Sequence, residues 1–190
     1  MTTEIAKLFP LQGRWTENEY FRLPDTNHPV ELSNGRLIIP EMPGDDHQNA
    51  IMNLSVAIYL FIHSRDLGKV RTSPLPTRLW KDHIREPDII FMSKAHSQRI
   101  RKKYWGVPDL VAEAISKSTE KVDRVEKFSE YAQAGISEYW IVDTINQAIE
   151  VYTLEQKNYI LLGKWGMGEI AHSKVIEGFE VKVDSVMEKK

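Results

Sequence analysis

The sequence predicts an α/β fold built on a mixed sheet, and three patterns carry this prediction. Residues 110–115 are apolar at all but one position, so both faces of the strand they form are expected to be covered, as in the centre of an α/β sheet. Two stretches, 45–64 and 118–135, carry apolar side chains at helical spacing. Shorter strand-like runs complete the sheet. We therefore expect a mixed sheet flanked by helices, with an added N-terminal hairpin and C-terminal strands.

Short motifs set the order of the remaining elements. A capping box from Thr16 to Glu19 begins a short helix, and Asn34-Gly35 predicts a hairpin turn within residues 30–39. Gly135 is expected to end the second long helix. The other expected elements are an extended segment at 70–80, strands at 89–92 and 138–143, a hairpin at 148–164, and a last segment, 174–186, that closes the sheet.

Composition narrows the class of protein. With 190 residues, 42% apolar and 27% charged, the chain is expected to form one soluble globular domain over residues 1–190. No export signal or membrane anchor is expected, and the absence of cysteine fits a cytoplasmic protein whose metal ligands would be Asp, Glu or His. A net charge of -2 argues against a nucleic-acid coat protein but allows an enzyme with a local basic patch.

Glu113 is the anomaly of the buried strand. An ionised Glu in the interior is costly unless a cation, a metal or a hydrogen-bond network compensates it, so Glu113 marks either a structural ion pair or a site. Asp109, on the same strand face, is about 13 Å away at ~3.3 Å per residue, too far to share an ion. Asp88, which opens the preceding buried strand, is the natural second carboxylate. Mg²⁺ or Mn²⁺ would relieve the repulsion between the two acids, and a nearby lysine would complete a site for phosphodiester hydrolysis.

Other polar residues have two interpretations each. Glu31 lies on a strand, where an exposed position is the simpler interpretation. His47 begins the core-facing stripe of its helix, either as a satisfied buried group or beside a helix N-terminus suited to phosphate. Asp123 and Lys127 lie four residues apart, off the apolar stripe, as in a surface ion pair. The basic run from 94 to 103 is either a solvated loop or a phosphate-contacting one.

These residues and their order resemble the Uma2 family, restriction-endonuclease-like proteins of the PD-(D/E)XK nuclease superfamily. The resemblance covers nearly the whole chain from Trp15 onward. It is carried, in order, by Glu31-Leu32, Gly35, His47, Pro87-Asp88, residues 108–113, Ser116, Ser118-Thr119, Asp123, Lys127, Tyr131-Ala132, Gly135, residues 138–143 and Gly178-Phe179.

The resemblance implies a restriction-endonuclease-like core, with Asp88 and Glu113 as the acids that bind Mg²⁺ or Mn²⁺. The superfamily pattern has a lysine two residues beyond the second acid, where this chain has Ile115. Lys127 on the following helix is the expected substitute, because an ammonium can reach the same point in space from another position in the sequence. Lys117 is the alternative.

The resemblance also implies a function. Glu31 and His47 match positions that the family usually keeps, so both are expected to face the site. A metal-dependent endonuclease is expected, with DNA as its partner, no membrane partner, and a homodimer as one arrangement that the sequence leaves open. Two alternatives remain: a catalytically silent nuclease fold that binds nucleic acid or protein, and a metal-dependent phosphoesterase acting on small nucleotides or RNA.

Overall fold

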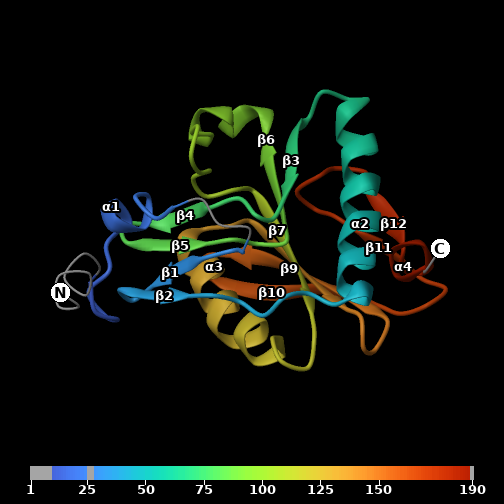
Figure 1. Cartoon of the computed structure of the whole chain (residues 1–190). Helices are drawn as coiled ribbons and strands as arrows, with labels where there is room; N and C mark the ends of the chain where they lie inside the picture. The colour runs from blue at the N-terminus through green and yellow to red at the C-terminus, as the bar shows by residue number, and fades with distance from the viewer. Residues whose placement is uncertain (1–9, 25–27, 189–190) are drawn as a thin grey trace.

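The centre of the molecule is a six-stranded mixed sheet (Figure 1), seen in a computed structural model that describes residues 10–24 and 28–188. The β7 and β8 pair is parallel, and the other four neighbouring pairs are antiparallel. A helical crossover joins the parallel pair, as parallel neighbours require. In spatial order the strands are β10 (Asn158–Trp165), β9 (Ala148–Glu155), β8 (Glu138–Asp143), β7 (Leu110–Ile115), β6 (Ile89–Ser93) and β3 (Gly68–Thr72).

Helices cover both faces of the central strands. Alternate residues of β7 pack into a core with α2 (Asp45–His63) on one face and with α3 (Phe128–Ala134) on the other. Every residue of β7 is buried, which confirms the expected central strand. Since Val111 and Ile115 belong to the α3 side, the alternation turns Glu113 toward α3 as well.

A second, four-stranded antiparallel sheet packs beside the first and supplies one wall of the site. Its core contains Leu32 and Ile84, both fully buried. The turn at Asn34-Gly35 has positive φ at both residues, the geometry that this pair of residues favours, so the predicted hairpin is confirmed. In spatial order the strands are β2 (Arg36–Ile38), β1 (Glu31–Ser33), β5 (His83–Arg85) and β4 (Thr77–Trp80), with α1 (Glu17–Tyr20) before them in the chain.

One expectation about strand partners was wrong. The last segment does not close the main sheet: β12 (Glu180–Lys182) pairs with β11 (Ile170–His172) in a separate ribbon, and α4 (Val183–Met187) follows. Strand periodicity identifies a strand but not the edge that it joins, which explains this error. The expected extended segment at 70–80 is present as two strands, β3 and β4, each at the edge of a different sheet. A cis Ser73-Pro74 bond lies between them.

The crossover helix differs from a regular α-helix. It begins at residue 120, and Val122–Lys127 within it is π-helical. The helix continues as α3, and the left-handed conformation of Gly135 (φ 85°) ends it as predicted. The basic run begins with a 3₁₀ turn, Lys94–Arg99. No helix among the described residues is long and apolar enough to cross a bilayer.

Candidate active site

The site lies where the pairing of β6 with β7 ends. The last pair is Ile89 with Ala112, so the same register continued by one residue sets Asp88 opposite Glu113. The carboxylate of Asp88 accepts the N–H of Ala114 at 2.9 Å, a donor to which β6 no longer offers a backbone partner. Both acids line one pocket of about 250 Å³. The end of a strand thus brings the two predicted acids together.

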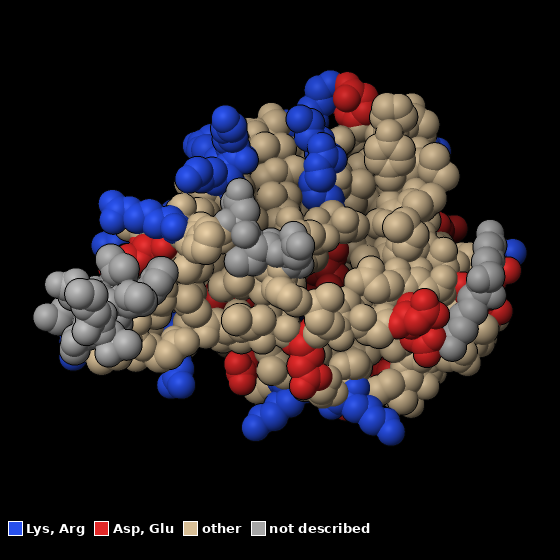
Figure 2. Space-filling model, in the orientation of Figure 1, with Lys and Arg blue, Asp and Glu red and all other residues tan. Residues whose placement is uncertain are grey.

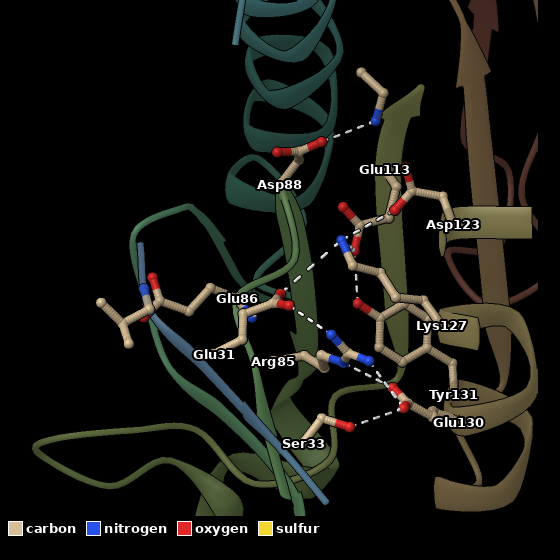
Figure 3. A network of polar contacts seen from close by, with 12 residues as sticks. Glu31, Ser33, Arg85, Glu86, Asp88, Glu113, Asp123, Lys127, Glu130 and Tyr131 are labelled. Atoms are coloured by element: carbon tan, nitrogen blue, oxygen red, sulfur yellow. Dashed lines mark hydrogen bonds and ion pairs between the residues drawn. The ribbon is translucent and has the colours of Figure 1, made fainter. Parts of the chain in front are cut away.

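Glu113 is nearly inaccessible and is held by two donors. Lys127 Nζ lies 3.0 Å from its Oε1, and the Tyr131 hydroxyl donates to the same oxygen at 2.5 Å (Figure 3). Burial raises the pKa of Glu113, and the charges of Asp88 and Asp123 raise it further, although the ammonium of Lys127 acts in the opposite direction. The site therefore carries an excess of negative charge that a cation would relieve.

Lys127 is not the surface ion-pair residue of the simpler interpretation. Its side chain is 11% exposed, and its ammonium lies 3.0 Å from Asp123 Oδ1 as well as from Glu113. Burial alone would lower the pKa of Lys127, but the surrounding carboxylates outweigh it, so the pKa is raised and the group stays an ammonium. Asp123 and Lys127 both belong to the π-helical segment, and the contact of Lys127 with Glu113 directs it to the strand.

His47 approaches Asp88 from the opposite face of the sheet. It occupies the first turn of α2, and its Nε2 lies 2.9 Å from Asp88 Oδ2. Its other ring nitrogen, Nδ1, is buried without a hydrogen-bond partner among the described residues. The His47 contact orients the carboxylate of Asp88, and His47 lines the same pocket as both acids.

Glu31 is buried rather than exposed, which excludes its simpler interpretation. It comes from β1 of the second sheet, and its carboxylate accepts hydrogen bonds from Arg85 Nη1 at 2.6 Å and from the N–H of Glu86 at 3.1 Å. The same carboxylate lies 4.0 Å from Lys127 Nζ. Arg85 is 1% exposed and also contacts Glu130 on α3 through two hydrogen bonds of 2.7 and 2.9 Å. Arg85 therefore joins the second sheet to the crossover helix beneath the site.

Sequence reasoning missed several residues of this network. Arg85 and Tyr131 were not singled out as site residues, although Arg85 directly precedes the Glu86-Pro87-Asp88 run and Tyr131 lies one helical turn after Lys127. That one-turn spacing from a candidate lysine was the available signal for Tyr131. For Arg85 the signal was weaker, because its two carboxylate partners are 54 and 45 residues away in the chain.

Lys117 and the basic run, the two remaining candidates, do not line the pocket. Ile115 packs in the core on the α3 side, and Lys117, just past the end of β7, is exposed, with no ion pair among the described contacts. In the basic run, Lys94 pairs with Asp66, whereas Arg101, Lys102 and Lys103 are exposed. Of the two lysines considered, Lys127 is the one that reaches Glu113.

The donors of the pocket fit a hard divalent cation. Asp88 makes its contacts through Oδ2 and Glu113 through Oε1, so each acid has a second oxygen without a hydrogen bond or ion pair in the described part of the chain. No three His, Cys, Asp or Glu side chains of the described residues converge as a ready-made metal cluster. Mg²⁺, however, is commonly held by one or two carboxylates with waters completing its shell.

Comparison with known proteins identifies the family of this chain. The model of the Uma2 family, described as a putative restriction endonuclease, matches residues 17–184. The chain belongs to the Uma2 family. This confirms the resemblance seen in the sequence. No functionally curated protein matches this Uma2 chain.

A solved structure shares the fold of this Uma2 protein. It is a protein from Anabaena variabilis ATCC 29413, described as a putative nuclease belonging to DUF820. The TM-score is 0.73 at 17% sequence identity, and the match covers 94% of this chain and 98% of that chain. At this identity the likeness concerns the fold, and it confirms the predicted mixed sheet flanked by helices.

Replacing Arg85 by Met should destabilise the protein by about 3–5 kcal/mol, because it leaves Glu31 and Glu130 buried without their shared cation. Urea unfolding measures this loss as a lower transition midpoint. Arg78→Met is the matched control: its pair with Glu17 is partly exposed, so about 1 kcal/mol or less is expected. Equal losses in the two variants would contradict a special role for Arg85.

Proposed function

We propose that this Uma2 protein is a Mg²⁺-dependent endonuclease that hydrolyses phosphodiester bonds of DNA, with Mn²⁺ as an alternative metal. The observation that carries the proposal is the 3.0 Å contact between Lys127 Nζ and Glu113 Oε1, beside Asp88 in a shared pocket. Two acids on neighbouring strands and one buried ammonium are the groups that metal-assisted phosphodiester hydrolysis needs. Family membership and a nuclease-like fold support the same interpretation.

The roles of the side chains follow from their contacts. Asp88 and Glu113 would hold the metal, which when bound supplies an activated water and polarises the phosphate. Lys127 holds its proton because carboxylates surround it, so it can donate to the charge that develops on the phosphate oxygens. Tyr131 and His47 act as positioning residues, since each fixes one acid through the oxygen that faces the protein. Glu31 lies 4.0 Å from Lys127 Nζ and helps to hold that ammonium in the site.

Removal of either acid tests the metal site directly. We expect Asp88→Asn and Glu113→Gln to weaken Mn²⁺ binding by about tenfold or more, equivalent to about 1.4 kcal/mol, in isothermal titration calorimetry. Asp66→Asn is the control, because its carboxylate is exposed and does not line the pocket. Wild-type protein that binds Mn²⁺ no better than either variant would favour the catalytically silent nuclease fold.

Lys127→Ala should reduce metal-dependent cleavage of DNA about a hundredfold, a loss of roughly 3 kcal/mol of transition-state stabilisation. Binding of Mn²⁺ should be largely retained, because the metal-binding acids are unchanged. The control is Lys117→Ala, which removes an exposed lysine adjacent to the same strand. Circular dichroism verifies that both variants fold, and full activity in folded Lys127→Ala would end its catalytic assignment.

The basic run should bind phosphates without sequence preference. Replacing Arg101, Lys102 and Lys103 by Gln is expected to flatten the salt dependence of duplex DNA binding, by about 0.9 in log–log slope for each phosphate that the protein no longer neutralises. Fluorescence anisotropy between low and moderate salt measures the slope. An unchanged slope would mean that the run is only solvated. The control removes the same charge at three exposed lysines of the C-terminal part, Lys157, Lys174 and Lys182.

A further inference from the structure

Asp123 is a buried acid that has no part in the reaction proposed above. Its side chain is 4% exposed and lines the pocket that holds Asp88 and Glu113. Figure 2 shows acidic side chains at the bottom of a hollow near the middle of the face turned to the viewer. A carboxylate in the interior is costly unless a cation accompanies it, so Asp123 depends on the cation beside it.

The cation beside Asp123 is Lys127, which contacts two acids at once (Figure 3). Its Nζ lies 3.0 Å from Asp123 Oδ1 and 3.0 Å from Glu113 Oε1. Glu31 is a more distant partner, at 4.0 Å. No other Lys, Arg or His of the described residues lies within ion-pair distance of Asp123 or Glu113. One ammonium therefore neutralises both carboxylates.

A metal bound at Glu113 would compete with Lys127 for this carboxylate. A divalent ion lies only about 2.0–2.6 Å from each oxygen that binds it. An ion on the second oxygen of Glu113 and the ammonium at Oε1 are then two positive charges on one small group, and they repel each other. Lys127 must therefore loosen its contact with Glu113 for the metal to bind.

The contacts allow this release without leaving a buried charge unpaired. Glu113 Oε1 keeps the hydrogen bond that the Tyr131 hydroxyl donates to it at 2.5 Å. Lys127 keeps Asp123, which lies four residues earlier on the same helix and therefore shares its position along the strand. A buried polar group that loses its last partner is penalised, and neither Glu113 nor Lys127 does so here.

The backbone of Asp123 is fixed by groups other than the two metal-binding acids. Its carbonyl oxygen accepts a hydrogen bond from the Tyr139 hydroxyl at 3.1 Å, and its N–H donates to the carbonyl oxygen of Thr119 at 3.0 Å. Tyr139 is a fully buried residue of β8. No three acids or histidines of residues 10–24 and 28–188 converge as a metal cluster, so Asp123 is not arranged as a third ligand. Asp123 is thus a fixed anchor beside the metal-binding pair.

We propose that Asp123 is the positioning residue of Lys127: when a divalent ion takes Glu113, Lys127 releases this carboxylate and remains in the pocket on Asp123. The ammonium then stays beside the reacting phosphate, held from a point that the metal does not occupy. This inference rests on the metal site of the proposed function and names the residue that keeps its lysine in place.

Asp123→Asn keeps the shape of the side chain and removes its charge. At saturating Mn²⁺ we expect kcat for DNA cleavage to fall about tenfold or more with KM unchanged, because a displaced ammonium no longer meets the phosphate correctly. The control is Glu126→Gln, which removes an exposed carboxylate of the same π-helical segment that does not line the pocket. Equal kcat values in the two variants would contradict the role of Asp123.

A combination with Lys127→Ala shows whether Asp123 acts through the lysine. Groups that work as one unit are not additive, so Asp123→Asn should lower kcat by less than about twofold once Lys127 is absent. Losses that multiply in the double variant would mean that Asp123 acts by another route, and they would overturn the inference.

Crystal structures of the full chain grown with EDTA and with Mn²⁺ test the exchange of partners directly. With Mn²⁺, Lys127 Nζ should stay within about 3.2 Å of an Asp123 oxygen and lie more than about 4 Å from Glu113 Oε1. Three results would overturn the inference: bound Mn²⁺ with Lys127 still on Glu113, Mn²⁺ coordinated by Asp123, and a pocket that takes up no Mn²⁺.

These structures also separate the inference from the proposed function, because they require no cleavage. Lys127 held by Asp123 beside bound Mn²⁺, in a protein that cuts no DNA, would sink the nuclease proposal and retain the exchange of partners. Metal-dependent cleavage by a protein whose Lys127 stays on Glu113 would retain the nuclease proposal and sink the exchange.

Discussion

The buried ammonium of Lys127 is the constraint on which the rest of the site depends. It is surrounded by carboxylates from three separate elements: Glu113 of β7, Asp123 of its own helix and Glu31 of β1. Such acids could not remain ionised together in the interior without a cation among them. Because the partners come from two sheets and a helix, the charge of Lys127 stabilises the packing of these three elements around the pocket.

The break in the main sheet explains how side chains from both faces can meet. A continuous sheet separates the groups on its two sides, and here α2 and α3 lie on opposite sides of β7. Just before β6 begins, Asp88 takes the place of the missing strand partner by accepting the N–H of Ala114. His47 from one side and Lys127 from the other approach the same pair of acids. The strand end therefore provides, within a single sheet, the meeting point that other proteins form between domains.

The sequence predicted those parts of the site that depend on local pattern. Asp88 and Glu113 could be found because each is an acid in or beside a strand of apolar residues, where an unpaired carboxylate is costly. Lys127 could be proposed only through the family resemblance, since its spacing alone favoured a surface pair. Its burial depends on the π-helical segment and on the second sheet, neither of which has a signal in the hydrophobic periodicity. Arg85 and the pairing of β12 depend likewise on contacts between distant segments, which a periodic pattern cannot select.

The π-helical segment Val122–Lys127 fixes the length of chain that the site can tolerate. A π-turn accommodates one more residue than an α-turn, so it acts as a phase shift within the helix. Loss of a single residue within this segment, before Lys127, would return it to α-helical phase and rotate the following side chains by about 100° around the helix axis. Tyr131 would turn away from Glu113 together with Lys127, since both reach it from the same helix. The crossover therefore constrains the number of residues between β7 and Lys127 as well as their identity.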